Sequence, residues 1–118
     1  MHLQLALGCS TNTVLHLTAI AKEVNVKINL DMINEISSRT PNLCRLSPAG
    51  PYHIQDLYEA GGIPAVMKEL SKKNLLNLDC ILFKNVTVEK VIENAVNKNE
   101  KVIAPIENPI VKLAELKY

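Results

Sequence analysis

Three consecutive polar side chains, Ser10, Thr11 and Asn12, stand between an apolar run and a segment with helical periodicity that carries His16. Ser and Thr are favoured at a helix N-cap, where the first backbone N–H groups also lack partners. Hydroxyl, amide and free N–H donors together suit a carboxylate or phosphate oxygen. The pattern therefore predicts an anion-binding site or an ordinary helix cap, and spacing alone favours the cap.

His16 lies about one helical turn beyond Asn12, on the same side of the predicted helix. A single His among Leu residues is more often a partly buried structural residue than an acid–base group. His53 stands three residues before Asp56, and this helical spacing favours capping or pairing with the carboxylate over catalysis. We assign no catalytic residue within this chain.

The three cysteines, Cys9, Cys44 and Cys80, are far apart and odd in number, which does not indicate a disulfide framework. Zinc and iron–sulfur sites usually contain a short Cys-x-x-Cys element, and this sequence has none. Cys44 and Cys80 are expected to be small buried hydrophobic side chains. Cys9 adjoins the predicted helix N-terminus, where the helix dipole lowers the pKa of a thiol. We predict no metal ligand.

The composition is that of a folded chain of one domain's size. Of the 118 residues, 47% are hydrophobic and 21% are charged, and the formal net charge is only +1. This balance, with 3% aromatic residues, argues against nucleic-acid and membrane-surface partners. No apolar run reaches the roughly 20 residues of a membrane span, and no basic signal-peptide region opens the chain. We expect a cytoplasmic protein without nucleic-acid or membrane partners.

Helices dominate the expected structure before residue 77. Apolar periodicity, capping residues and the positions of Gly and Pro define them. Residues 1–8 are expected to be the last turns of a helix. The further predictions are a helix from the Ser10 or Thr11 cap to near Glu23, a helix over 32–38 capped by Asp31, a loop over 40–52, a helix over 53–60 followed by Gly61, and a helix from Pro64 to 71 or 72.

The pattern changes after Asn77. Residues 80–83 and 101–104 are short strand candidates, and Thr87 is placed to cap a helix over 88–95. The predicted fold class is α/β, a predominantly helical segment over 1–77 followed by a small βα unit over 78–118. The tail over 111–118 is a short amphipathic piece with nothing visible to pack on.

Three motifs occur in the order ALGCSTNTVLHLTAIA, RTPNLCRLSPAG and DLYEAGGIPAVMKEL. In type and order they closely resemble the dihydroxy-acid dehydratase family of branched-chain amino-acid biosynthesis, from about Leu5 to Ile110. The related phosphogluconate and sugar-acid dehydratases share the Ser-Thr-Asn element. The run Thr13-Val14-Leu15-His16-Leu17 is similar to the dihydroxy-acid branch.

The resemblance implies a hydro-lyase that converts 2,3-dihydroxy acids to 2-oxo acids with an iron–sulfur cluster and magnesium, in a usually homo-oligomeric enzyme. The family's cluster-cysteine motifs and its catalytic-serine motif do not occur in this chain. The resemblance therefore implies that the chain is a truncated central fragment of a larger α/β dehydratase fold. This fragment would run from within the N-terminal domain towards the C-terminal domain. We expect the chain alone to bind no cofactor and to be inactive.

The resemblance also implies site residues and leaves alternatives open. Ser10, Thr11, Asn12 and His16 are expected to contact the small-molecule dihydroxy acid, at a wall of the substrate cavity. Cys9 stands where many members of the family have Gly, which argues against a role as cluster ligand. The alternatives are a fragment of a phosphogluconate or sugar-acid dehydratase, or a non-catalytic remnant that acts at most as an interaction module.

Overall fold

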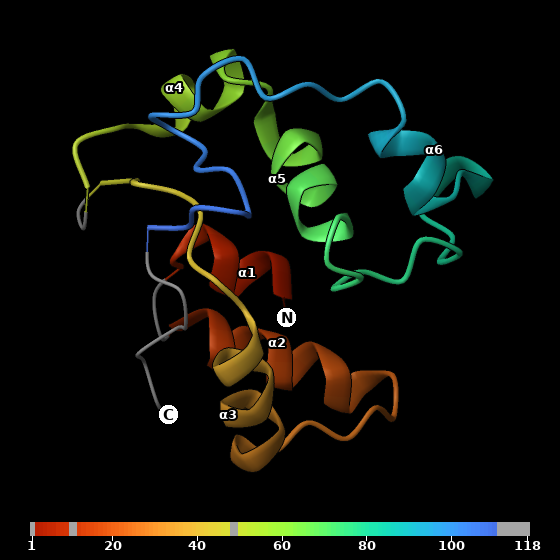
Figure 1. The fold of residues 1–118 in the computed structure, drawn as a ribbon. Coiled ribbons are helices and arrows are strands. Elements are labelled where there is room, and N and C mark those ends of the chain that lie inside the picture. The colour runs from red at the N-terminus through yellow and green to blue at the C-terminus, as the bar shows by residue number, and fades with distance from the viewer. Residues whose placement is uncertain (1, 10–11, 48–49, 111–118) are drawn as a thin grey trace.

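Helices make up the regular structure of the residues that the computed structural model describes, 2–9, 12–47 and 50–110 (Figure 1). In chain order these are α1 His2–Leu7, α2 Asn12–Glu23, α3 Leu30–Arg39, α4 Ile54–Glu59, α5 Gly62–Ser71, the 3₁₀ helix η1 Phe83–Asn85 and α6 Val88–Ile92. Within those ranges β-pairing is confined to isolated bridges. The helical half of the fold-class prediction is confirmed, and the strands are not.

One hydrophobic core joins α1, α4 and α5 to two non-helical segments, 43–46 and 102–106. Its buried members are Ala6, Leu43, Cys44, Leu57, Ala60, Ala65, Val66, Leu70, Val102, Ile103 and Ile106. In α5 the spacing of Ala65, Val66 and Leu70 gives one apolar stripe that faces this core. Residues on both sides of position 77 therefore pack together.

Residues 42–44 run between α1 and the C-terminal segment. The N–H of Leu43 donates to the carbonyl of Ala6 at 2.9 Å, and the N–H of Ala104 donates to the carbonyl of Leu43 at 2.7 Å. The prediction of a strand over 101–104 is wrong, because pairing stops at the single antiparallel bridge between Cys44 and Ile103. Pro41 and Pro105 flank this bridge and lack the N–H that a longer ladder would need.

The prediction of a strand over 80–83 is also wrong. The Leu82 N–H donates to the Val86 carbonyl at 2.7 Å, across a turn in which Lys84 and Asn85 have φ values of 58° and 60°. Two consecutive residues in the left-handed region are typical of a tight hairpin turn. Phe83 is 79% exposed, since no second layer covers this hairpin among the described residues.

Local capping explains where three of the described helices start, α3, α4 and α6. α2 ends at Glu23 as predicted, but α3 begins earlier than expected because Asn29, and not Asp31, is its cap: the Asn29 Oδ1 accepts from the Met32 N–H at 2.9 Å. Thr87 caps α6 as predicted, although that helix ends at Ile92. The tail over 111–118 lies outside the described residues.

The start and end of α4 follow the prediction closely. The His53 N–H donates to the Asp56 Oδ2 at 2.7 Å, so this pair caps the helix. Gly61 follows the helix with a φ of 129°. Gly62 then opens α5, with Pro64 in the first turn where its missing N–H costs nothing.

The pair α2 and α3, with the segment between them, lies to one side of the core (Figure 1). We call residues 12–39 the α2–α3 hairpin. Among the described residues, the core cluster contains no member of this hairpin. A tie to α1 comes from His2, whose Nδ1 lies 2.6 Å from the Thr40 Oγ1 just after α3.

The first prediction concerns Glu69, a buried carboxylate of α5 that holds the C-terminal segment. Its Oε2 accepts from the Ile106 N–H at 3.1 Å, and its Oε1 accepts from the Lys72 Nζ at 2.9 Å. We expect Glu69→Ala to lower the free energy of unfolding by about 1–3 kcal/mol, because the buried Ile106 N–H loses its acceptor. Urea titration measures the change.

Glu69→Gln is the matched variant, since its amide oxygen still accepts from the Ile106 N–H. We expect it to cost less than Glu69→Ala. Lys72→Ala should cost least, because the Lys72 side chain is 46% exposed and surface ion pairs contribute roughly 0–1 kcal/mol. Equal losses for the Ala and Gln variants would show that the Ile106 N–H does not depend on Glu69.

The second prediction compares two adjacent glycines. A Cβ on Gly61 would collide with the backbone carbonyl of Val96 and lie 2.7 Å from the Ala65 Cβ, whereas a Cβ on Gly62 would have Pro64 Cδ at 3.6 Å as its nearest neighbour. Both have positive φ, so Gly62→Ala should cost about 1–2 kcal/mol of backbone strain. Gly61→Ala should lower the unfolding midpoint clearly further, as differential scanning calorimetry would measure; similar midpoints would contradict this.

Candidate functional site

Gly8 and Cys9 form the turn that joins α1 to α2. The Gly8 N–H donates to the Leu5 carbonyl at 3.1 Å and the Cys9 N–H donates to the Gln4 carbonyl at 3.3 Å. This bond pair is the Schellman arrangement, which needs a left-handed residue, and Gly8 has a φ of 71°. A Cβ on Gly8 would also lie 2.8 Å from the Asn42 Nδ2. Glycine here lets the turn after α1 lie against Asn42.

Asn12 and His16, two of the four predicted site residues, are exposed on α2. Four residues apart, they share one face of the helix. The described part of this helix runs from Asn12 to Glu23, and the predicted cap at Ser10 or Thr11 is untested. Ser10 and Thr11 themselves lie outside the described residues. A substrate-binding role for the four stays a prediction.

A pocket of about 380 Å³ opens beside the Gly8 turn. Its lining residues are Leu7, Gly8, Asn42, Cys44, Arg45, Leu46, Gly50, Pro51 and Ile110. Among the described residues of this lining, Arg45 carries the one charged side chain, and Asn42 contributes an amide. A guanidinium and an amide are donors that match a carboxylate or phosphate. Asn12 and His16 are not part of this described lining.

Asn42 and Arg45 are not among the site residues predicted from the sequence. The available signal was their place in the predicted loop over 40–52, because a polar side chain on a loop between two prolines is free to bind. That signal does not show which other part of the chain the loop packs against. The pocket exists only because the loop folds back against the end of α1.

The cysteines differ from the prediction at two positions. Burial raises the pKa of the half-buried Cys9 thiol above its usual value, opposite to the direction predicted from its place before α2. Burial, with the nearby Cys9 sulfur, raises the pKa of Cys44 to about 12. Cys44 is buried as predicted, but Cys80 is exposed because the hairpin that follows it has no covering layer.

The donor sets for a metal or a cluster are poor. Across residues 2–9, 12–47 and 50–110, no three His, Cys, Asp or Glu side chains lie close enough together to share a metal ion. Iron–sulfur clusters are held by several Cys side chains together, and the three cysteines do not form such a group: Cys44 is buried and Cys80 is exposed. The described residues do not fit an iron–sulfur cluster.

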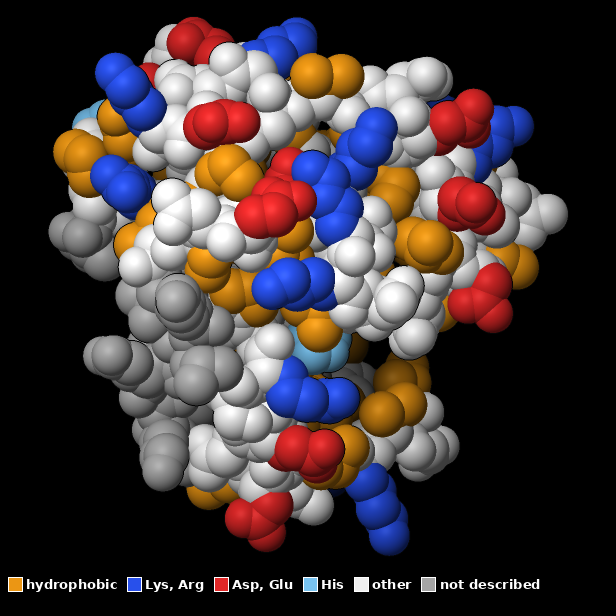
Figure 2. Space-filling model, in the orientation of Figure 1, with side chains coloured by type: hydrophobic (Ala, Val, Ile, Leu, Met, Phe, Trp, Pro, Cys, Tyr) orange, Lys and Arg blue, Asp and Glu red, His pale blue; other side chains and the backbone are white. Residues whose placement is uncertain are grey.

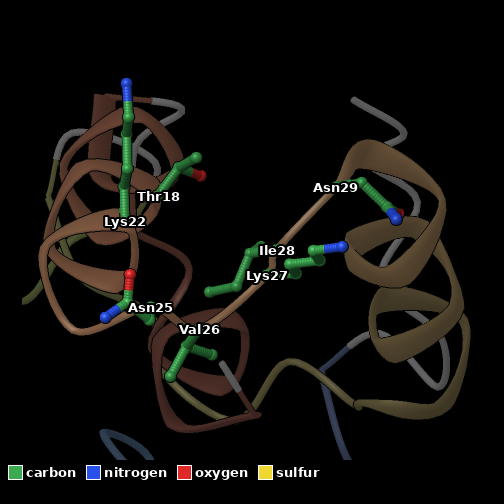
Figure 3. A pocket seen from close by; sticks show the side chains of 7 residues that line it. All are labelled: Thr18, Lys22, Asn25, Val26, Lys27, Ile28 and Asn29. Carbon is green, nitrogen blue, oxygen red and sulfur yellow. The ribbon is translucent and has the colours of Figure 1, made fainter.

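A larger and more open pocket, of about 530 Å³, lies within the α2–α3 hairpin. Figure 3 shows Thr18, Lys22 and Asn25 on the α2 side of it, and Val26, Lys27, Ile28 and Asn29 along the segment that leads to α3. Both charged side chains of this lining are lysines. Among its described lining residues, this pocket offers no acid–base pair for catalysis. It is a positively charged surface with apolar side chains beside the lysines.

The outer surface carries both signs of charge. Figure 2 shows Lys and Arg side chains interspersed with Asp and Glu over the visible face, so that face has no large field of one sign. None of the helices in the described part of the chain has both the length and the apolar character that crossing a bilayer needs. The expected absence of nucleic-acid partners stays a prediction.

Comparison with known proteins identifies a family. Residues 1–94 match the family model described as dihydroxy-acid/6-phosphogluconate dehydratase N-terminal. Dihydroxy-acid dehydratases of Carboxydothermus hydrogenoformans and Acetivibrio thermocellus are 64% and 67% identical over 105 residues, and that of Ruminiclostridium cellulolyticum is 60% identical. Each alignment covers 89% of this chain and 19% of the relative. The chain therefore spans about a fifth of the length of the curated relatives it matches.

The third prediction follows from the unequal burial of the thiols. With iodoacetamide at about pH 8, Cys80 should be alkylated first, Cys9 more slowly, and Cys44 only when the chain unfolds, since the exposed thiolate is the reacting species. Mass spectrometry of a time course measures the order. Labelling in urea, where all three should react alike, is the control; Cys9 reacting ahead of Cys80 would contradict the burial described.

Proposed function

The chain belongs to the dihydroxy-acid/6-phosphogluconate dehydratase family, and we propose that it serves as a segment of a hydro-lyase that converts a 2,3-dihydroxy acid to a 2-oxo acid. The observation that carries the proposal is the high identity, across most of the chain, with relatives that bear the name dihydroxy-acid dehydratase. Those names favour a dihydroxy acid over 6-phosphogluconate. The product would be a branched-chain 2-oxo acid for valine and isoleucine synthesis, within a larger α/β fold.

The proposed reaction removes a proton from C2 and the hydroxyl group from C3. The C2–H electron pair forms the C2–C3 double bond as hydroxide departs with a proton to become water, and the enol then becomes the ketone. A base near C2 and an acid at the departing hydroxyl are both required. We assign neither of these two roles to a described residue, so the part proposed for this chain is binding and orientation.

Two places in the described chain carry donors for the substrate carboxylate. One is the start of α2, with the amide of Asn12 and the imidazole of His16 on one exposed face. The other is the pocket beside Gly8, with Arg45 and Asn42. A guanidinium binds a carboxylate in two parallel hydrogen bonds, which fixes its orientation as well as its place. Each place gives a separate variant for the experiment below.

An iron–sulfur cluster and magnesium belong to the proposal for the whole enzyme, and their ligands must come from polypeptide outside this chain. The donor set of the described residues does not fit a cluster, because no three His, Cys, Asp or Glu side chains among them lie close enough together. Assembly into a homo-oligomer is likewise proposed for the whole enzyme.

The fourth prediction is that the isolated chain is inactive, whereas a chimaera is active. Orienting a carboxylate contributes about 1.5–3 kcal/mol for each charge-assisted hydrogen bond, and a typical enzyme lowers its barrier by about 8 kcal/mol or more. The assay is formation of 2-oxo acid from 2,3-dihydroxyisovalerate, without oxygen, with iron, sulfide and magnesium supplied. In the chimaera this chain replaces the matching segment of the Carboxydothermus hydrogenoformans relative.

Variants of the chimaera then test the two places. Loss of one charge-assisted hydrogen bond should lower kcat/KM by roughly tenfold to a hundredfold. We expect this loss for Arg45→Ala or for Asn12→Ala. Lys84→Ala, on the exposed hairpin turn, is the control and should leave kcat/KM unchanged. A folded but inactive chimaera would sink the proposed function. Turnover by the isolated chain that survives repurification would sink the prediction of inactivity.

A further inference from the structure

The α2–α3 hairpin buries few of its residues for two helices of their length. Of the 12 residues of α2 only Val14 and Ala21 are buried, and of the 10 residues of α3 only Ile33 and Ser37. Helices of this length are marginal in water by themselves and depend on packing of an apolar face. No residue of α2 or α3 belongs to the described core cluster. The hairpin therefore lacks the burial that supports α1 and α5.

Exposed apolar side chains are concentrated on this hairpin. Half of the 12 large hydrophobic side chains that are exposed in the described structure fall between positions 15 and 32: Leu15, Ile20, Val24, Val26, Leu30 and Met32. Leu15 is 69% exposed and Ile20 is 61% exposed. Single exposed apolar residues are ordinary, but clustering on one element marks an interaction surface.

The exposed face of α2 combines these apolar side chains with the predicted site residues. Leu15, Ala19 and Ile20 surround His16 on the solvent side of the helix, by the spacing of an α-helix. Asn12 lies one turn before His16 on the same face. The residues predicted to contact substrate are thus set in an apolar surface that faces solvent in this chain.

Two observations indicate which kind of polypeptide packs on this surface. The chain spans 19% of the length of its relatives, so most of the polypeptide of such an enzyme lies outside it and must contact this segment somewhere. The pocket within the hairpin has Lys22 and Lys27 as its charged lining, so an occupant with apolar groups and a carboxylate is complementary to it. A second copy docked by the same pocket would set lysines against lysines.

We propose that the exposed face of the α2–α3 hairpin is the surface on which the remaining polypeptide of the dehydratase packs, with an acidic side chain of that polypeptide opposite Lys22 and Lys27. Asn12 and His16 then lie at the boundary between this segment and the rest of the enzyme. The inference rests on the proposed function only in taking the chain to work as a segment of a longer dehydratase. It does not depend on the reaction.

The test compares one pair of substitutions in two settings. In the isolated chain Leu15→Asp with Ile20→Asp should leave the unfolding midpoint nearly unchanged, because both side chains are already in water. In the chimaera with the Carboxydothermus hydrogenoformans relative the same pair should lower the midpoint by about 5 °C or more, since charges are then forced into a packed interface. An unchanged midpoint in the chimaera overturns the proposal.

Ile81→Asp with Phe83→Asp is the matched control, as these side chains are 67% and 79% exposed on a different element. It should lower the midpoint of the chimaera less than the hairpin pair does. Equal losses of unfolding midpoint from the two pairs would show that the hairpin is no more buried in the chimaera than the control site, which overturns the proposal. Charge reversal by Lys22→Glu with Lys27→Glu should destabilise the chimaera and not the isolated chain.

A binding experiment keeps the proposal testable if the chimaera fails to fold. The tagged chain is co-expressed with the relative from which the matching segment has been deleted, supplied as separate polypeptide. Co-purification is expected, with loss on Leu15→Asp and Ile20→Asp and retention with the Ile81 and Phe83 control. Absence of co-purification, or equal loss with the control pair, overturns the proposal.

Sedimentation of the isolated chain tests the other occupant. A monomer is expected at micromolar concentration, and a dimer that Leu15→Asp with Ile20→Asp dissolves would assign the surface to a second copy. The readouts separate this inference from the proposed function. An inactive chimaera that shows the expected differences in unfolding midpoint contradicts the proposed function alone. An active chimaera whose midpoint is unchanged by Leu15→Asp with Ile20→Asp contradicts this inference alone.

Discussion

The backbone of Leu43 is held from both sides, and the fold depends on this double attachment. Its N–H is bonded to the carbonyl of Ala6 in α1, and its carbonyl is bonded to the N–H of Ala104 in the C-terminal segment. The Leu43 side chain is fully buried in the same core. Three pieces of chain that are distant in sequence are thereby brought together, and α5 packs on the apolar surface that results.

The same non-helical segment makes the pocket beside Gly8. Leu43 and Cys44 are buried, and the next residue, Arg45, is exposed at the pocket, so the segment turns from core to site within one step. Burial that fixes Cys44 also raises its pKa to about 12, which leaves it as a structural thiol. A binding side chain is therefore placed by a backbone that the core already holds, which keeps its position defined.

Local sequence signals predicted the features that are decided within a few residues. The end of α2 at Glu23, the His53–Asp56 cap and Gly61 after α4 all depend on neighbours in the chain. The same logic failed where two local candidates competed. Asn29 and Asp31 both suit an N-cap, and Asn29 caps α3 because its side chain reaches the free Met32 N–H.

The sequence by itself determined the family and the helices, since motifs, apolar periodicity and caps are written in short stretches of residues. Only the tertiary structure decided that residues 80–83 and 101–104 pair through single bridges, that Cys80 is exposed while Cys9 is partly buried, and that Arg45 lines a pocket. Strand pairing, burial and thiol pKa depend on which distant segments arrive alongside. A short apolar run carries the same composition whether or not a partner comes to cover it.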